Sequence, residues 1–314
     1  MKREKVIIDT DPGVDDATAL VLNFFDKHLD IKLITTVCGN VGITKATRNA
    51  CHLLDLFNLD IPIAKGASTP MFRKPINAEY LHGKYGLGGY IAPQRATHKP
   101  IKDDAVEAIY KLLLQYPQQI TIFVLGPHTN IGNLLTHHPD AKDLIKQIMF
   151  MGGSPYGAPG FPDHDSFNIA SDPEAFDIVL KSGIPLSMIP SNLGRYKAQL
   201  DEKDVNKIKR TNSVGQFFAK TYETYWEPDL LEQGIKAIAT NDCCVIFYFL
   251  HPEIFDTVKA DITVDTKEHV GRTYANFHDG GRLTMVVGAN RPKFLKVFFN
   301  KLKKLGKYEI PTLS

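Results

Sequence analysis

Apolar runs of strand length alternate with helical patterns from residue 6 to residue 189, and this alternation restricts the fold more than any other feature. The runs that are predicted to be strands cover residues 6–8, 31–37, 61–64, 120–125, 147–151 and 185–189. The segments between them with a helical spacing of apolar side chains cover residues 15–25, 44–57, 103–116, 134–135 and 172–181. Such an alternation predicts an α/β fold with an open, mostly parallel sheet, helices on both faces and a Rossmann-like core.

The remainder of the chain has a different pattern. Its predicted elements are a largely helical segment at 201–226, a very apolar run at 241–250, strands at 258–264 and 282–287, and a basic helix at 291–304. No repeat, low-complexity segment or linker divides the sequence. We therefore expect one domain over residues 1–314, with a helical cap contributed by the later part. Ligands of such sheets bind at the carboxyl ends of the strands.

Composition limits the partners. The 314 residues carry a net charge of only +2, which gives no basis for nucleic acid or an anionic membrane as the main partner. No stretch approaches the ~18–20 apolar residues of a membrane span, and the first apolar run is too short for a signal-peptide core. Cys38, Cys51, Cys243 and Cys244 form no CxxC pair and are predicted to be reduced. These features predict a cytoplasmic protein.

Four carboxylates follow the first predicted strand within eight residues: Asp9, Asp11, Asp15 and Asp16. Two like charges ~5 Å apart repel by roughly 3 kcal/mol at an effective dielectric constant of ~20. The N-terminus of a helix offsets only about 0.3–1 kcal/mol for each anion. Either some of the carboxylates are protonated or a cation is bound. An all-oxygen ligand set favours Ca²⁺ or Mg²⁺ over zinc.

The segment from Asp9 to Ala17 resembles the N-terminal signature of the inosine–uridine preferring nucleoside hydrolase family. The similarity continues in the same order through Cys38-Gly39-Asn40, His82-Gly83, Gly86-Leu87-Gly88-Gly89, His128-Thr129-Asn130-Ile131, Met151-Gly152-Gly153, Phe167-Asn168, Asp172-Pro173-Glu174-Ala175 and Asp242. The resemblance implies the fold of that family and a Ca²⁺-dependent N-glycosyl hydrolase of purine and pyrimidine ribonucleosides, active in salvage. It also implies a homodimer or homotetramer.

The resemblance assigns roles to individual residues. The metal would be held by Asp11, Asp16, the backbone carbonyl of Thr129 and Asp242. The substrate would be bound by Asp15, Asn40, Met151, Asn168 and Asp242. A metal-bound water would lose its proton with help from Asp11, and Asp15 on the 2′-hydroxyl would stabilise an oxocarbenium-like transition state. We therefore expect weak activity on 2′-deoxynucleosides.

Three positions depart from the family pattern. Asn241 stands at the catalytic position where many members have a histidine that assists departure of the base, and asparagine donates no proton at neutral pH. Ser166 stands where a glutamate commonly contacts the ribose 5′-hydroxyl. Asn192 stands where an aspartate is frequent. The metal ligands are intact, but the contacts to the leaving base and to the ribose end are changed.

Other residues are expected to serve the substrate. His82 is a candidate for protonating the base, because its glycine-rich surroundings suit a loop that closes over substrate. Tyr222, Tyr225 and Trp226 are candidates for stacking on the base, with core packing as the alternative. His128 is expected either near the metal or in simple packing.

Two competing functions remain open. A strand followed by Asp-x-Asp also begins the haloacid-dehalogenase-type phosphatases, in which Asp9 would be the nucleophile and Mg²⁺ the metal. The adjacent Asp15 and Asp16 argue against this class. The changes at Asn241 and Ser166 leave room for a protein that binds a nucleoside or ribose without hydrolysing it.

Overall fold

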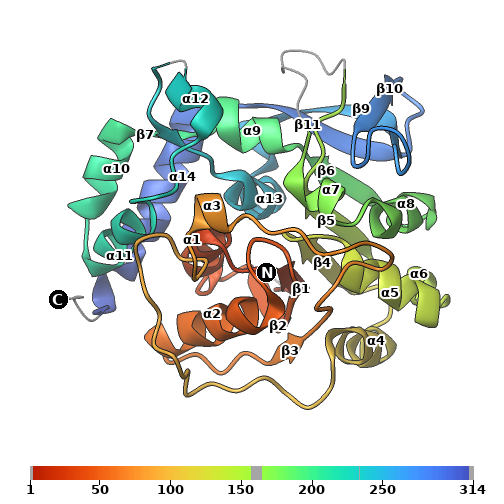
Figure 1. Cartoon of the computed structure of the whole chain (residues 1–314), viewed down its shortest axis with the longest axis horizontal. Coiled ribbons are helices and arrows are strands. Elements are labelled where there is room, and N and C mark those ends of the chain that lie inside the picture. Colours follow the sequence, from red (N-terminus) through yellow and green to blue (C-terminus); the bar gives the residue numbers. More distant parts are fainter. Residues whose placement is uncertain (1–2, 157–164, 233, 311–314) are drawn as a thin grey trace.

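The fold is built on a nine-stranded sheet, seen in a computed structural model that describes residues 3–156, 165–232 and 234–310 (Figure 1). The strands of the sheet are β1 (Glu4–Thr10), β2 (Leu29–Thr36), β3 (Ile63–Lys65), β4 (Ile120–Val124), β5 (Gln147–Met151), β6 (Leu186–Ile189), β9 (Phe255–Val264), β10 (Thr273–Phe277) and β11 (Leu283–Ala289). Their spatial order is β10-β9-β11-β6-β5-β4-β1-β2-β3. A small antiparallel pair, β7 (Leu200–Asp201) and β8 (Ala237–Ile238), lies outside it.

The predicted mostly parallel sheet is confirmed. All neighbouring strands from β3 to β11 pair in parallel, and only β9 runs antiparallel to both of its neighbours. Successive side chains of β1 point to opposite faces, so Val6 and Ile8 join one hydrophobic core while Ile7 joins the other. Both faces of the central strands are therefore buried, which explains their continuous apolar runs.

Helices cover both faces, as the alternation predicts (Figure 1). One core includes side chains of α1 (Val14–Asn23), α2 (Ile43–Leu56), α13 (Asn241–Leu250) and α14 (Arg291–Lys304). The other core includes side chains of α4 (Ala105–Gln115), α5 (Thr129–His137) and α8 (Pro173–Lys181). The predicted basic helix at 291–304 coincides with α14.

Shorter helices complete the chain. They are α3 (Glu79–His82), α6 (Ala141–Leu144), α7 (Phe167–Ser171), α9 (Ser191–Tyr196), α10 (Glu202–Lys209), α11 (Ser213–Thr221) and α12 (Pro228–Glu232), with 3₁₀ turns at Pro252–Ile254 and Leu305–Lys307. Helices α10 and α11 pack on each other and supply side chains to the same core as α1. They account for the predicted helical segment at 201–226, which the structure ends at Thr221.

The last third of the chain also extends the sheet. Strand β11 pairs in parallel with β6, and β9 and β10 continue from it to the edge. The apolar run at 241–250 is helix α13, whose residues 241–247 are buried. It contacts α1 and α9 as well as β5 and β6, so it lies in the core.

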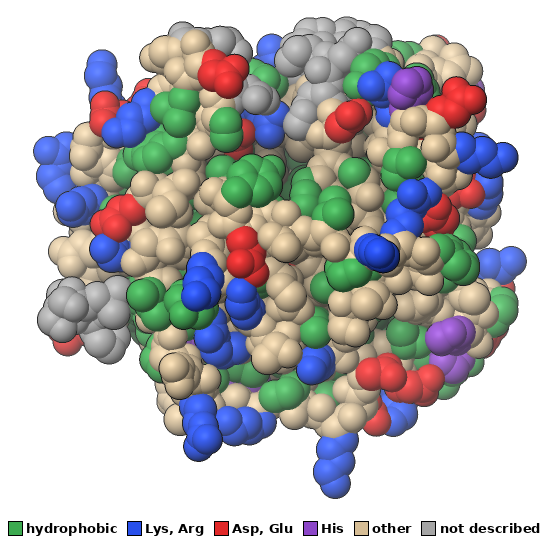
Figure 2. Space-filling view, viewed as in Figure 1, with side chains coloured by type: hydrophobic (Ala, Val, Ile, Leu, Met, Phe, Trp, Pro, Cys, Tyr) green, Lys and Arg blue, Asp and Glu red, His purple; other side chains and the backbone are tan. Residues whose placement is uncertain are grey.

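The described residues include no helix that is both long and apolar enough to cross a membrane. All four cysteines are free and buried, which agrees with the prediction that they are reduced. Figure 2 shows basic and acidic side chains interspersed over one face of the molecule, without a large area of one sign. This distribution fits the small net charge.

Candidate active site

The acidic cluster lies where the strand order of the sheet reverses. Strand β1 lies between β2 and β4, so the connections from β1 and from β4 lead to opposite sides of the sheet. Open α/β sheets bind ligands at the carboxyl ends of the strands at such a point. The carboxyl end of β1 supplies Asp11, the end of β2 is followed by Asn40, and the end of β4 is followed by Thr129.

Asp16 is fixed at the start of α1. Its carboxylate accepts hydrogen bonds from the backbone N–H of Gly13 (2.9 Å), from the side-chain amide of Asn40 (3.0 Å) and from the hydroxyl of Thr10. The helix begins at Val14 with Gly13 as its N-cap. An acidic side chain in the first turn of a helix is favourable for the exposed N–H groups there, so local structure and site geometry agree.

The side chain of Asp11 packs closely against the loops that contain Gly39 and Gly126. Its Oδ2 accepts a 2.6 Å hydrogen bond from the backbone N–H of Asn40. A Cβ on Gly39 would lie 1.9 Å from Oδ2, and a Cβ on Gly126 would lie 2.7 Å from Oδ1. Oδ1 of Asp11 is fully buried and has no hydrogen-bond partner among the described residues. Such an acceptor is free to ligate a cation.

Asp242 comes from the last third of the chain, in the first turn of α13. It is 1% exposed, and neither carboxylate oxygen has a hydrogen-bond partner among the described residues. One oxygen each of Asp15, Asp16 and Asp242 lie within 4.8 Å of one another. This trio contains Asp15 in place of Asp11, whereas the resemblance assigned Asp11 to the metal.

Burial and mutual repulsion raise the pKa of the carboxyls. The pKa of Asp15 is raised to about 8, first by burial and then by the charge of Asp16. Burial, with the charges of Asp16 and Asp15, holds the pKa of Asp11 well above its usual range. Burial and the charges of all three neighbours do the same for the pKa of Asp242, and burial raises the pKa of Asp16. The cluster is therefore stable only with bound protons or with a cation.

Asp9 has a supporting position. Its Oδ1 accepts hydrogen bonds from the hydroxyl of Thr35 and from the side-chain amide of Asn130 (2.7 Å), and burial raises its pKa to about 7. Asn130 and Thr129 begin α5, so these bonds tie that helix to the end of β1. Asp9 is fully buried and does not line the pocket, which argues against the nucleophile role of a phosphatase.

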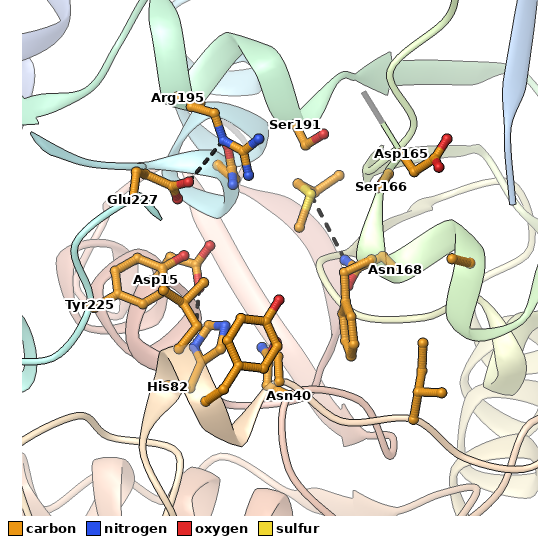
Figure 3. Close-up of a pocket in the computed structure, with 18 residues that line it drawn as sticks. Asp15, Asn40, His82, Asp165, Ser166, Asn168, Ser191, Arg195, Tyr225 and Glu227 are labelled. Carbon is orange, nitrogen blue, oxygen red and sulfur yellow. Dashed lines mark hydrogen bonds and ion pairs between the residues drawn. The ribbon is translucent and has the colours of Figure 1, made fainter. Parts of the chain in front are cut away.

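A pocket of about 280 Å³ opens above the cluster (Figure 3). This volume is close to the lower end of the ~300–1,000 Å³ typical of small-molecule pockets. The predicted residues that line it are Asp15, Asn40, His82, Met151, Ser166, Asn168, Tyr225 and Asn241. The predicted residues that do not line it are Asp11, Asp16, Thr129 and Asp242. Asp16 and Asp242 lie beside the lining residue Asp15.

Amide and sulfur groups form one wall of the pocket. The side-chain amide of Asn168 donates to the carbonyl of Leu125 (2.5 Å) and contacts the sulfur of Met151 at 3.8 Å. Asn40 has its amide on Asp16, so its orientation is also fixed. Ser166 is 2% exposed and lies at the same wall (Figure 3). Fixed polar groups of this kind suit the hydroxyl groups of a sugar.

His82 is a neutral imidazole in the pocket wall. The backbone N–H of Val14 donates to its Nδ1 at 3.1 Å, so the ring proton is on Nε2. Burial lowers the pKa of His82 to about 3. Nδ1 lies 4.0 Å from Oδ1 of Asp15, and the ring lies against Tyr225 with centroids 4.8 Å apart. His82 can donate a hydrogen bond through Nε2 without being an imidazolium acid.

Only one of the three aromatic candidates reaches the pocket. Tyr225 lines it and donates a hydrogen bond to Asp15. Tyr222 follows the alternative, core packing, because its hydroxyl pairs with that of Thr18 at 3.0 Å inside the core. Trp226 packs against the core, under the ammonium group of Lys236, and does not line the pocket. His128 packs in the core between Phe150 and Phe176.

The lining residues that the sequence did not predict include three polar ones in one region: Ser191, Arg195 and Glu227. Arg195 and Glu227 form an ion pair with a Nε–Oε2 distance of 2.9 Å. Ser191 and Arg195 belong to α9, directly after β6. Ligands of parallel sheets bind at the carboxyl ends of the strands. Both residues follow the end of β6, so this rule could have predicted them. No sequence signal joins Glu227 to Arg195.

An open α/β sheet, buried carboxylates at the reversal of strand order and a pocket of fixed amides above them are typical of an enzyme that acts on a small polar ligand. The chain belongs to the inosine-uridine preferring nucleoside hydrolase family, because the sequence model of that family matches residues 6–296. It is therefore an N-glycosyl hydrolase, as the sequence predicts.

Individual relatives agree with this assignment. The chain is 37% identical over 264 residues to the non-specific ribonucleoside hydrolase RihC of Salmonella newport and of Salmonella typhi, covering 83% of this chain and of each relative. Among solved structures, it is similar to the plant nucleoside hydrolase PpNRh1 (TM-score 0.85, 28% identity, 96% and 99% of the two chains). It is also similar to the purine-preferring ribonucleoside hydrolase from Gardnerella vaginalis (TM-score 0.87, 26% identity, 97% and 99%).

Proposed function

We propose that this chain hydrolyses the N-glycosidic bond of purine and pyrimidine ribonucleosides with Ca²⁺ held by its acidic cluster. The observation that carries the proposal is the group of buried carboxylates below the pocket, whose pKa values are raised. Oδ1 of Asp11 and both oxygens of Asp242 have no hydrogen-bond donor among the described residues. A relative described as non-specific supports activity on both classes of base.

The residues present fit a hard divalent cation. Asp11 and Asp242 offer three buried oxygens that have no hydrogen-bond partner among the described residues. Asp16 and the carbonyl of Thr129 would complete the ligand set, and Asp15 is close enough to share in it. Carboxylate and carbonyl oxygens are the ligands that Ca²⁺ prefers. When bound, the ion would hold the ribose diol and make a water molecule easier to deprotonate.

The chain's own residues then carry out the reaction. Asp11 accepts a proton from the attacking water, whose oxygen forms a bond to the anomeric carbon. The C–N bond breaks, and its electron pair leaves with the base. Asp15 holds the 2′-hydroxyl and its carboxylate stabilises the positive charge that develops on the sugar. Asn40 and Asn168, with Ser166 at the 5′ end, orient the ribose. The products are free ribose and the base.

Release of ribose tests the proposal directly. The protein is incubated with Ca²⁺ and inosine, adenosine, uridine or cytidine, and free ribose is measured. We expect release from at least one nucleoside of each class. Binding observed by calorimetry with no ribose released would instead support a binding protein, the reading that Asn241 and Ser166 leave open. The assembly state and the cellular location remain predictions.

Removal of the 2′-hydroxyl is expected to lower kcat/KM by about 100-fold or more, because the substrate loses its contact with Asp15 and half of the diol. Inosine and 2′-deoxyinosine are compared under the same conditions. The 5′-deoxy analogue is the matched control, since the 5′ end meets the short side chain of Ser166 and is expected to matter less. Equal turnover of inosine and its 2′-deoxy analogue would contradict the assigned role of Asp15.

Calcium is expected to reverse a pH-dependent loss of stability. In the metal-free chain the pKa values of Asp9 and Asp15 are about 7 and about 8, above the unfolded value of 3.8. The folded state therefore binds more protons than the unfolded state between pH 4 and pH 8, so stability falls as the pH rises. We expect the melting temperature in chelator to drop by roughly 5–10 °C from pH 5.5 to pH 8.

Adding Ca²⁺ at pH 8 should restore most of that loss and release protons, which calorimetry in buffers of different ionisation enthalpy counts. Ca²⁺ should have little effect at pH 5, where protons already occupy the carboxyls. A melting temperature that is independent of both pH and Ca²⁺ would show that the cluster binds no such ion.

A further inference from the structure

A buried ion pair borders the pocket on the side away from His82. Nε of Arg195 lies 2.9 Å from Oε2 of Glu227, and the two side chains are only 12% and 2% exposed. Both line the pocket, and Figure 3 shows the pair opposite Asn40 and His82, with Asp15 between the two sides. Among the described lining residues, Arg195 is the sole lysine or arginine.

The pair lies beside Asn241. Gly194, which directly precedes Arg195, is so close to the start of α13 that an added Cβ would lie 2.4 Å from Oδ1 of Asn241 and 2.5 Å from its backbone nitrogen. The N–H of Thr240 also points to the carbonyl of Gly194. Arg195 therefore emerges into the pocket next to the asparagine that stands where the family has its leaving-group histidine.

The pair also lies within electrostatic reach of the reacting sugar. The charge of Glu227 contributes to the raised pKa of both Asp15 and Tyr225. Asp15 holds the ribose in the proposed function, and Tyr225, Asn241, Arg195 and Glu227 line the same pocket as Asp15.

The departing base needs stabilisation that no titrating group here supplies. Asn241 has no acidic proton, and its Oδ1 has no hydrogen-bond partner among the described residues. Nδ1 of His82 accepts a hydrogen bond from the backbone N–H of Val14, and His82 lies across the pocket from the ion pair (Figure 3). Tyr225 donates its hydroxyl proton to Asp15. A guanidinium group is always charged and presents several N–H donors in a fixed plane. It can hold an anion without giving up a proton.

We propose that Arg195 is the residue that activates the leaving base, an assignment that rests on the proposed hydrolase function. Its N–H groups donate to the ring nitrogen and carbonyl oxygen of the base, and Glu227 fixes the guanidinium in the pocket. The electron pair of the C–N bond moves onto the base, which leaves as an anion bound to Arg195. Arg195 stays protonated, and the base takes its proton from solvent water after the bond has broken.

The test compares substrates with different leaving groups. Inosine and uridine release poor anions, whereas p-nitrophenyl β-D-ribofuranoside releases a stable phenolate that needs no donor. Arg195→Met is expected to lower kcat on inosine and uridine by about 100-fold or more, the usual effect of removing a donor from a developing anion. On the phenyl riboside its kcat should change by less than about 5-fold. Arg195→Lys keeps the charge, so its kcat on inosine and uridine should lie between those of the wild type and Arg195→Met.

Arg73→Met is the matched control. Arg73 pairs with Glu174 at 2.5 Å on another part of the molecule, and its loss should leave both substrates unchanged. Glu227→Gln keeps the arginine but loosens it, so a smaller selective loss of about 10-fold on inosine is expected. If Arg195→Met does not fold, the comparison of substrates is made with Glu227→Gln.

The outcomes separate the two proposals. Wild-type protein that cleaves none of the three substrates contradicts the proposed function itself. A second outcome is that the wild type cleaves nucleosides, whereas Arg195→Met and Glu227→Gln lose equal activity on all substrates at an unchanged melting temperature. This outcome overturns the assignment of Arg195 and leaves the hydrolase function intact. A full nucleoside rate in Arg195→Met overturns it as well.

Discussion

Replacing Asp242 with asparagine is expected to abolish activity and to stabilise the metal-free protein at the same time. Both oxygens of this carboxylate lack hydrogen-bond donors among the described residues, and one of them lies within 4.8 Å of oxygens of Asp15 and Asp16. Removing a like charge at such a distance relieves up to about 3 kcal/mol of repulsion. We expect kcat/KM to fall by at least about 1,000-fold, as for loss of a metal ligand.

The melting temperature of Asp242→Asn in chelator should rise by about 3–8 °C at pH 8, and Ca²⁺ should no longer raise it. Asp172→Asn gives the contrasting result. The carboxylate of Asp172 is buried but accepts from the N–H of Met71 (2.9 Å), the hydroxyl of Thr129 (2.7 Å) and the N–H of Ala175 (3.2 Å). Its amide variant leaves donors unpaired and should lose about 1–3 kcal/mol of stability. Destabilisation of the metal-free chain by Asp242→Asn would contradict the argument from repulsion.

Alanine at position 39 is expected to lower kcat/KM by about 100-fold or more. Its Cβ would lie 1.9 Å from Oδ2 of Asp11 and 2.9 Å from Cδ of Pro127, so the carboxylate must move. The movement also breaks the 2.6 Å hydrogen bond from the N–H of Asn40. A displacement of 1 Å in a reacting group costs about 100-fold in rate.

Gly42→Ala is the matched control, three residues away in the same loop. A Cβ there meets no atom within 4 Å, and the backbone φ of −61° suits alanine. Steady-state kinetics and thermal melting of both variants separate the two effects. Gly42→Ala should keep nearly full activity, with at most a small loss of stability from its N-cap position. Full activity of Gly39→Ala would remove Asp11 from the reaction.

The sequence predicts elements well where the apolar pattern has one interpretation. The run at 147–151 is β5 and the pattern at 291–304 is α14, each at the predicted bounds. The run at 241–250 has no helical or strand period, because α13 buries residues all round it, so its type could not be read from the pattern. Strand β10 was missed because it is a short strand at the edge of the sheet, next to β9, and leaves Tyr274 40% exposed.

The site residues also differ in how well the sequence could place them. Residues that follow strands directly, such as Asn40 after β2, could be placed because parallel strands bring their carboxyl ends together. Tyr222 and Tyr225 could not be told apart, since the helix α11 ends at Thr221 and the spacing no longer sets their directions. The pairing of Arg195 with Glu227 depends on how α9 meets the loop before α12, which no local pattern encodes.

Helix α13 places the last carboxylate of the cluster far along the chain from the first. A nascent polypeptide that has emerged only as far as β6 can pair the six strands around β1, yet it still lacks the oxygens of Asp242. At the proposed site, an ion would then have too few ligands to stay bound before α13 has docked on α1. Retention of the ion during synthesis on the ribosome would thus mark the moment at which α13 has docked on α1.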